Sequence, residues 1–126
     1  MRKAALLACL ALPPFWSGAA LAHHPGSHAS RLPDGRVRVE VAAVATDGCT
    51  RIERVRAAAP PSVSAVPGAA AVTAELVRAG AGPCTMAVVA VRSETVLDLA
   101  PGIRQIMLYI LAPDGTLAST ERVPIR

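Results

Sequence analysis

The stretch RVRVEVAAVA, residues 36–45, decides the fold class of this 126-residue chain. Arg36, Arg38 and Glu40 occupy alternate positions, and a valine follows each of them. Successive side chains of an extended strand point to opposite faces, so this pattern places the charged groups in solvent and the valines in a core. The sequence therefore predicts a half-buried β-strand over residues 36–45.

Segments of similar strand character follow it along the chain. Residues 50–56 (TRIERVR) predict an edge strand, because charged side chains discourage pairing with another chain. Residues 69–78 (AAAVTAELVR) are long enough for a helix, but their β-branched residues and the flanking Gly and Pro favour a strand. Between these two segments lies a Pro-rich connection, residues 57–68, whose prolines exclude a central strand.

The C-terminal half predicts four more strands. A buried strand is expected over 85–92, with Met86 in its core face, and a short one over 94–99. The segments 103–111 and 116–125 flank the dipeptide Asp114-Gly115, which is typical of a hairpin turn. Short strands with a turn signal every 8–12 residues predict an all-β fold, namely a small antiparallel β-sandwich of the immunoglobulin-like or Greek-key kind over residues 36–126.

Residues 1–22 have the features of a secretory signal peptide. A basic start, Met1-Arg2-Lys3, precedes an apolar run over 4–12, and Ala20-Leu21-Ala22 offers small residues at the cleavage positions. The apolar run is too short to cross about 30 Å of hydrocarbon. We therefore predict cleavage after Ala22 and export to the bacterial periplasm or beyond, with no membrane span left. An uncleaved anchor and a lipidated Cys9 are the alternatives.

The cysteine count agrees with an exported protein. Cleavage removes Cys9 and leaves Cys49 and Cys84, which we predict to form a disulfide because such bonds persist in oxidising compartments. Closing this loop would stabilise the fold by about 3–4 kcal/mol in the chain-entropy model. A reactive thiol pair is the alternative, but neither cysteine lies in a C-x-x-C motif or beside a histidine.

The sequence offers little that predicts catalysis. Every histidine lies at position 23, 24 or 28, so the presumed domain has no imidazole to activate a nucleophile. It also lacks a Gly-x-Ser-x-Gly elbow, a phosphate-binding Gly loop and an H-E-x-x-H motif. With 2% aromatic residues and no basic stripe, nucleic-acid binding has no support either. We expect a protein that is not an enzyme.

The predicted mature N-terminus is the candidate metal site: His23-His24-Pro25-Gly26-Ser27-His28. Cleavage would expose the α-amine of His23 next to its own imidazole, and this pair chelates Cu(II) best among divalent metals. Pro25 stands where the tight amino-terminal copper motif needs a histidine, and it has no N–H to contribute. The candidate ligands His23, His24 and His28 are therefore an incomplete set, which a residue of the domain, a second chain or water must finish. The alternative is a plain polar leader over 23–35.

Two functions follow. The leading His23 after a cleavage site, together with the expected fold, resembles small periplasmic copper-binding proteins of the copper-resistance C type. That resemblance implies copper as the cofactor and ligands from the domain, although the domain here contains no histidine. The second function is a structural or interaction domain whose sheet edge or connection 57–68 contacts a periplasmic protein partner. A polar or acidic patch within reach of His28 would distinguish the two.

Overall fold

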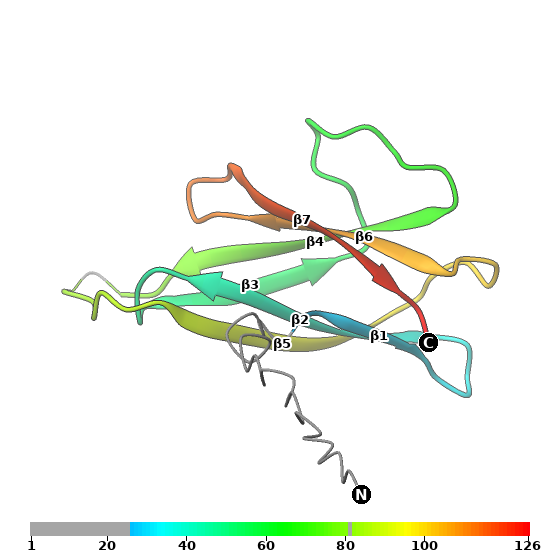
Figure 1. Ribbon diagram of the computed structural model, residues 1–126, viewed down its shortest axis with the longest axis horizontal. Coiled ribbons are helices and arrows are strands. Elements are labelled where there is room, and N and C mark those ends of the chain that lie inside the picture. Colours follow the sequence, from blue (N-terminus) through cyan, green and yellow to red (C-terminus); the bar gives the residue numbers. More distant parts are fainter. Residues whose placement is uncertain (1–25, 81) are drawn as a thin grey trace, which may run out of the picture.

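The computed structural model describes residues 26–80 and 82–126, and within them every regular element is a strand (Figure 1). The strands are β1 (His28–Arg31), β2 (Val37–Ala45), β3 (Thr50–Arg56), β4 (Ala69–Arg78), β5 (Val89–Leu97), β6 (Gln105–Leu111) and β7 (Leu117–Pro124). The all-β prediction is confirmed. The predicted signal peptide, residues 1–22, and the candidate ligands His23 and His24 lie outside the described residues. Within the described part, no helix is long and apolar enough to span a membrane.

The strands form two sheets, one with the order β1-β2-β5 and the other with the order β3-β4-β6-β7. Neighbouring strands run antiparallel, except that β4 and β6 run parallel. The expectation of a wholly antiparallel arrangement is therefore wrong for this pair. The chain leaves the four-stranded sheet after β4, forms β5 in the other sheet and then returns as β6. Two reversals of direction restore the direction of β4.

Both sheets contribute to one hydrophobic core. Val37, Val39 and Val41 of β2 are fully buried, as the alternation in residues 36–45 predicted. The buried cluster also contains residues of the other sheet: Val72, Ala74, Leu76, Ile106, Leu108, Ile110 and Val123. One face of each sheet is thus excluded from water by the other sheet.

Several predicted elements are confirmed at their expected places. Residues 50–56 form an edge strand, and residues 69–78 form a strand, not a helix. The turn at Asp114-Gly115 joins β6 and β7, where Ala112 N donates to Thr116 O at 2.8 Å. Gly115 has φ +86°, a left-handed conformation that glycine adopts without steric cost.

Strand β5 differs from the prediction. In place of a buried strand over 85–92 and a short one over 94–99, a single strand spans Val89–Leu97. Its length follows that of β2, its one neighbour in the described part of the chain, because pairing ends where Ala45 of β2 meets Val89. Residues 85–88 extend beyond that point, and Met86 is 82% exposed instead of lying in the core.

Strand β1 lies within the segment 23–35 that the sequence analysis assigned to a polar leader. It pairs with β2, so the sheet begins at His28 and not at residue 36. A turn over residues 32–36 joins the two strands, with Leu32 N donating to Arg36 O at 2.7 Å and Gly35 at φ +90°. This turn contains the same Pro-Asp-Gly tripeptide as the turn between β6 and β7.

The predicted disulfide is confirmed. Cys49 and Cys84 are bonded, with their Cα atoms 5.6 Å apart. Cys49 directly precedes β3 and Cys84 lies shortly before β5, so the bond joins the two sheets where these edge strands begin.

Candidate functional site

His28, the one candidate ligand that the structure describes, begins β1 and is exposed. It lies opposite Glu40 of β2, and Glu40 lies opposite Glu94 of β5. Directly opposed residues of antiparallel strands project from the same face, with Cβ atoms about 4.5–5.5 Å apart. An imidazole and two carboxylates therefore form one row across the outer face of the three-stranded sheet. We call these three residues the outer-face row.

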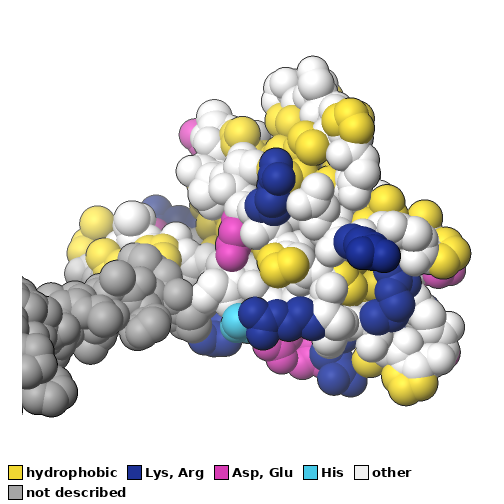
Figure 2. All heavy atoms as spheres, turned by 45° about the vertical axis from the view of Figure 1, so that its right-hand side comes forward, with side chains coloured by type: hydrophobic (Ala, Val, Ile, Leu, Met, Phe, Trp, Pro, Cys, Tyr) yellow, Lys and Arg dark blue, Asp and Glu magenta, His cyan; other side chains and the backbone are white. Residues whose placement is uncertain are grey.

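The surroundings of the outer-face row are polar and open. A surface depression of about 210 Å³ is lined by Glu40, Arg92, Ser93 and Glu94. Arg38 Nε approaches Glu94 Oε1 at 3.0 Å, and both side chains are about half exposed. Figure 2 shows the histidine beside basic and acidic side chains on this surface. A cation binding here would replace Arg38 as the partner of Glu94.

The structure brings His28 together with carboxylates that the sequence analysis did not join to it. Glu40 was expected to face solvent, as it does, but its pairing with His28 depends on β1, which was not predicted. His23 and His24 lie outside the described residues. The backbone from His23 to His28 can span at most about 18 Å, so the predicted N-terminus stays within reach of the outer-face row.

A second group of possible ligand atoms surrounds the disulfide. One atom each from Asp47, Cys49 and Cys84 lie within 4.8 Å of one another. The sulfur atoms are bonded to each other, however, and a cysteine binds metal as a free thiolate. This group is therefore a disulfide beside a turn, and it carries no metal assignment.

Asp47 organises that turn. Its Oδ1 accepts hydrogen bonds from Thr50 Oγ1 and from Cys49 N, both at 2.9 Å. The hydrogen bond from Thr50 holds the pKa of the Asp47 carboxyl below its ordinary value. The carboxylate thus fixes the chain between β2 and β3, where Cys49 must meet its partner.

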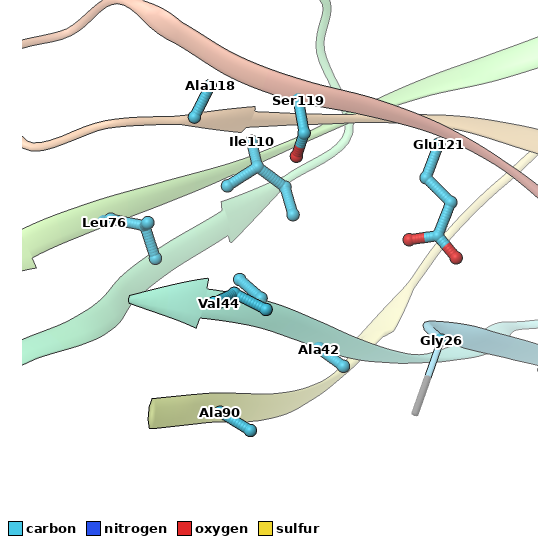
Figure 3. A pocket seen from close by; sticks show the side chains of 10 residues that line it. Gly26, Ala42, Val44, Leu76, Ala90, Ile110, Ala118, Ser119 and Glu121 are labelled. Carbon is cyan, nitrogen blue, oxygen red and sulfur yellow. The ribbon is translucent and has the colours of Figure 1, made fainter. Parts of the chain in front are cut away.

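A cleft of about 500 Å³ opens between β2 and β7. Figure 3 shows its lining side chains, which are mostly small and apolar, with Glu121 reaching down from β7 toward Gly26. Among the described residues that line it, Glu121 is the only charged one. Its Oε1 accepts a hydrogen bond from Ser27 N at 3.2 Å.

The sequence analysis did not single out Glu121, which is half-buried. The signal that could have placed it is the period-two pattern of β7. Val123 is buried, and Glu121 stands two residues before it, so both point toward the inner face. Comparison with known protein families, curated proteins and solved structures finds no match to this chain.

Proposed function

We propose that this protein is exported, loses residues 1–22, and binds Cu(II) or another divalent metal through its new N-terminus without catalysing a reaction. His23 is the anchor in this proposal, through its α-amine and imidazole. His24 and His28 supply further nitrogen donors. The protein would work in the bacterial periplasm or outside the cell.

The observation that supports the proposal is the outer-face row. The predicted ligand set needs a residue of the domain to complete it, and His28 lies in register with Glu40 and Glu94. Mixed nitrogen and oxygen donors suit Cu(II), which favours tetragonal coordination by such ligands. The donors are accessible, because all three residues of the row are exposed.

Export and the finer fold assignment belong to the same proposal. The Cys49–Cys84 bond suits an oxidising compartment such as the periplasm. Two sheets with a shared core suit a β-sandwich of the Greek-key or immunoglobulin-like kind, although the parallel pairing of β4 with β6 departs from the antiparallel pattern of immunoglobulin domains.

Copper titration of the processed protein tests the proposal. The full chain is expressed with export, and its intact mass is first compared with that of His23–Arg126. We expect a Kd for Cu(II) below about 10 μM, which corresponds to about −6.8 kcal/mol. Affinity should fall as the donors protonate between about pH 7 and pH 5. Zn(II) should bind more weakly than Cu(II).

Matched variants distinguish the contribution of His23 from those of the other proposed ligands. A Gly-Pro extension before His23 removes the chelate of amine and imidazole, and we expect it to weaken binding at least about tenfold, or about 1.4 kcal/mol. A one-residue extension is unsuitable because it would move His24 to the third position, where the amino-terminal copper motif needs a histidine. The Gly-Pro extension moves His23 to that position, but its proline has no N–H, so the amide ligand that the motif takes from the second residue is missing. Glu40→Gln should weaken binding less than the extension does. Glu53→Gln, an exposed change on β3, should have no effect. Equal affinity of the native and extended chains contradicts the proposal.

A second candidate function, a protein-interaction domain, is favoured by one observation. Met86 and Val88 are 82% and 76% exposed, on a segment outside any strand. A contiguous patch of exposed apolar side chains is a common mark of a contact with a partner, and these two residues would form part of such a patch. If the native chain binds no Cu(II) below about 10 μM, the protein partner becomes the better hypothesis.

A further inference from the structure

The cleft beside Glu121 has no role in the proposed metal site, yet it lies where the chain enters the described structure. The parallel bridge between Ala29 of β1 and Ile125 joins the three-stranded sheet to the residues that directly follow β7. Arg31 N donates to Arg126 O at 2.8 Å along the same seam. On the N-terminal side of these contacts the two parts of the chain separate, and the cleft begins beside Gly26.

The end of β1 is fixed in a way that directs the preceding chain to the cleft. Ser27 is 7% exposed, and its hydroxyl exchanges hydrogen bonds with the backbone of Ala42 on β2. Its backbone N–H points the other way and donates to Glu121 Oε1. A Cβ atom added to Gly26 would lie 3.3 Å from the same carboxylate oxygen. The chain thus passes directly over Glu121.

Glu121 is an unusual group to place in an apolar cleft. Its neighbours in the lining are alanine, valine, leucine, isoleucine, serine and glycine. Among the residues that the structure describes, it forms no ion pair. Removing a carboxylate from water is costly unless a donor or a cation compensates it. One backbone N–H compensates it only in part.

We propose that, in the processed chain without metal, His23–Pro25 covers this cleft, with the α-amine of His23 paired to the carboxylate of Glu121. The inference rests on the cleavage after Ala22 that the proposed function includes. It does not depend on metal binding. The occupant is the segment of this chain that directly precedes Gly26, and cleavage gives it a positive charge at its first residue.

Chain length and charge both fit this occupant. The backbone from the nitrogen of His23 to that of Ser27 spans at most about 14 Å, and Pro25-Gly26 is a dipeptide that favours a turn. An α-amine has a pKa of about 7.7–8.0, so it is mostly cationic at neutral pH and matches the carboxylate. In the uncleaved chain the same nitrogen belongs to a peptide bond and has no charge. Removal of the signal peptide would therefore create the ion pair.

A zero-length cross-link tests the inference with little ambiguity. Lys3 is the only lysine in the sequence, so the α-amine is the only primary amine of the processed protein. A water-soluble carbodiimide activates a carboxyl group, and the amine attacks that carbonyl carbon. An amide forms, and the carbodiimide leaves as its urea. The exported protein, metal-free and dilute, is treated with this reagent, digested and mapped by mass spectrometry.

We expect one intramolecular amide between His23 and Glu121. It should disappear in Glu121→Gln and persist in Glu40→Gln, the matched carboxylate on the outer face. A cross-link to Glu40, Glu94 or any other carboxyl group overturns the inference, and so does the absence of a cross-link. These outcomes leave the copper titration unaffected. A mass that shows another first residue refutes the processing on which both proposals rest.

Discussion

The middle strands of the two sheets bury their side chains in different ways. Along β2, buried and exposed residues alternate over most of the strand. Along β6, Leu108, Tyr109 and Ile110 are buried in succession, and along β4 the same holds for residues 72–74. Among the residues that the structure describes, the three-stranded sheet is therefore covered on one face, whereas the four-stranded sheet is covered on both faces at its centre.

The second cover is the Pro-rich connection between β3 and β4. Thr73 is fully buried and donates its hydroxyl hydrogen to the carbonyl oxygen of Ala58, and Pro60 is buried as well. Figure 1 shows the connection as the green loop that leaves β3 and returns as β4.

This difference between the two sheets explains why the outer-face row lies on the three-stranded sheet. An uncovered face can hold His28, Glu40 and Glu94 in water, and a covered centre cannot.

The disulfide joins the two sheets, and removing it should have the largest effect. Replacing both Cys49 and Cys84 by alanine should lower the free energy of unfolding by about 3–4 kcal/mol, because the unfolded chain regains the entropy of the closed loop. Urea denaturation under oxidising conditions measures this loss. Reductant should weaken the unmodified protein by a similar amount and leave the double variant unchanged. A loss within about 0.5 kcal/mol, as for a surface substitution, would contradict the role of the bond.

A smaller effect should distinguish the covered sheet from the uncovered face. Ile106 of β6 is fully buried, and Ile106→Val should cost about 0.5–1.5 kcal/mol through the cavity it leaves. Val96 of β5 lies opposite Arg38 on the outer face and is 38% exposed, and Val96→Ala should stay within about 0.5 kcal/mol although it removes more atoms. Chemical denaturation of both variants gives the comparison. Equal losses would mean that the outer face of the three-stranded sheet is covered in solution.

The sequence predicted correctly those strands and turns whose structure depends on their own residues. The alternation in residues 36–45 placed β2 because one face of that strand meets the core and the other meets water. Asp114-Gly115 placed a hairpin because its geometry needs a glycine in the left-handed region. By contrast, the bounds of β5 depend on where β2 ends, and the residues of β5 contain no signal that would predict those bounds.

Strand β1 shows that a local signal can be present and still be overlooked. Pro33-Asp34-Gly35 is the same tripeptide that marked the later hairpin, but a cluster of histidines before it suggested a leader. The candidate site was predicted only as far as His28. Its neighbours Glu40 and Glu94 come from strands distant in sequence, and only the register of the sheet brings them into one row.

The two Pro-Asp-Gly turns offer a matched pair, one in each sheet. In each turn, the aspartate Oδ1 accepts the backbone N–H of the second residue after it, at 3.0 Å. The side-chain donors differ: Arg36 Nε lies 2.8 Å from Asp34, and Thr116 Oγ1 lies 2.6 Å from Asp114. These side-chain hydrogen bonds are the main reason that the pKa of each carboxyl lies below its ordinary value.

The smallest predicted effect follows from that difference in donors. A lowered pKa means that each carboxylate stabilises the fold above the ordinary carboxyl pKa and ceases to do so as the pH falls through its lowered pKa. Raising the salt concentration from about 0.1 M to 1 M shortens the Debye length from about 10 Å to about 3 Å. The pKa of Asp34 should therefore rise toward its ordinary value, because its partner Arg36 is charged, while that of Asp114 should change less.

Carboxyl-carbon NMR titration at the two salt concentrations measures both groups in one sample. Arg36→Ala should raise the pKa of Asp34 and remove its salt dependence, whereas Thr116→Ala should raise only that of Asp114. An equal response of the two carboxyls to salt would show that the charge of Arg36 adds nothing to the hydrogen bond it donates.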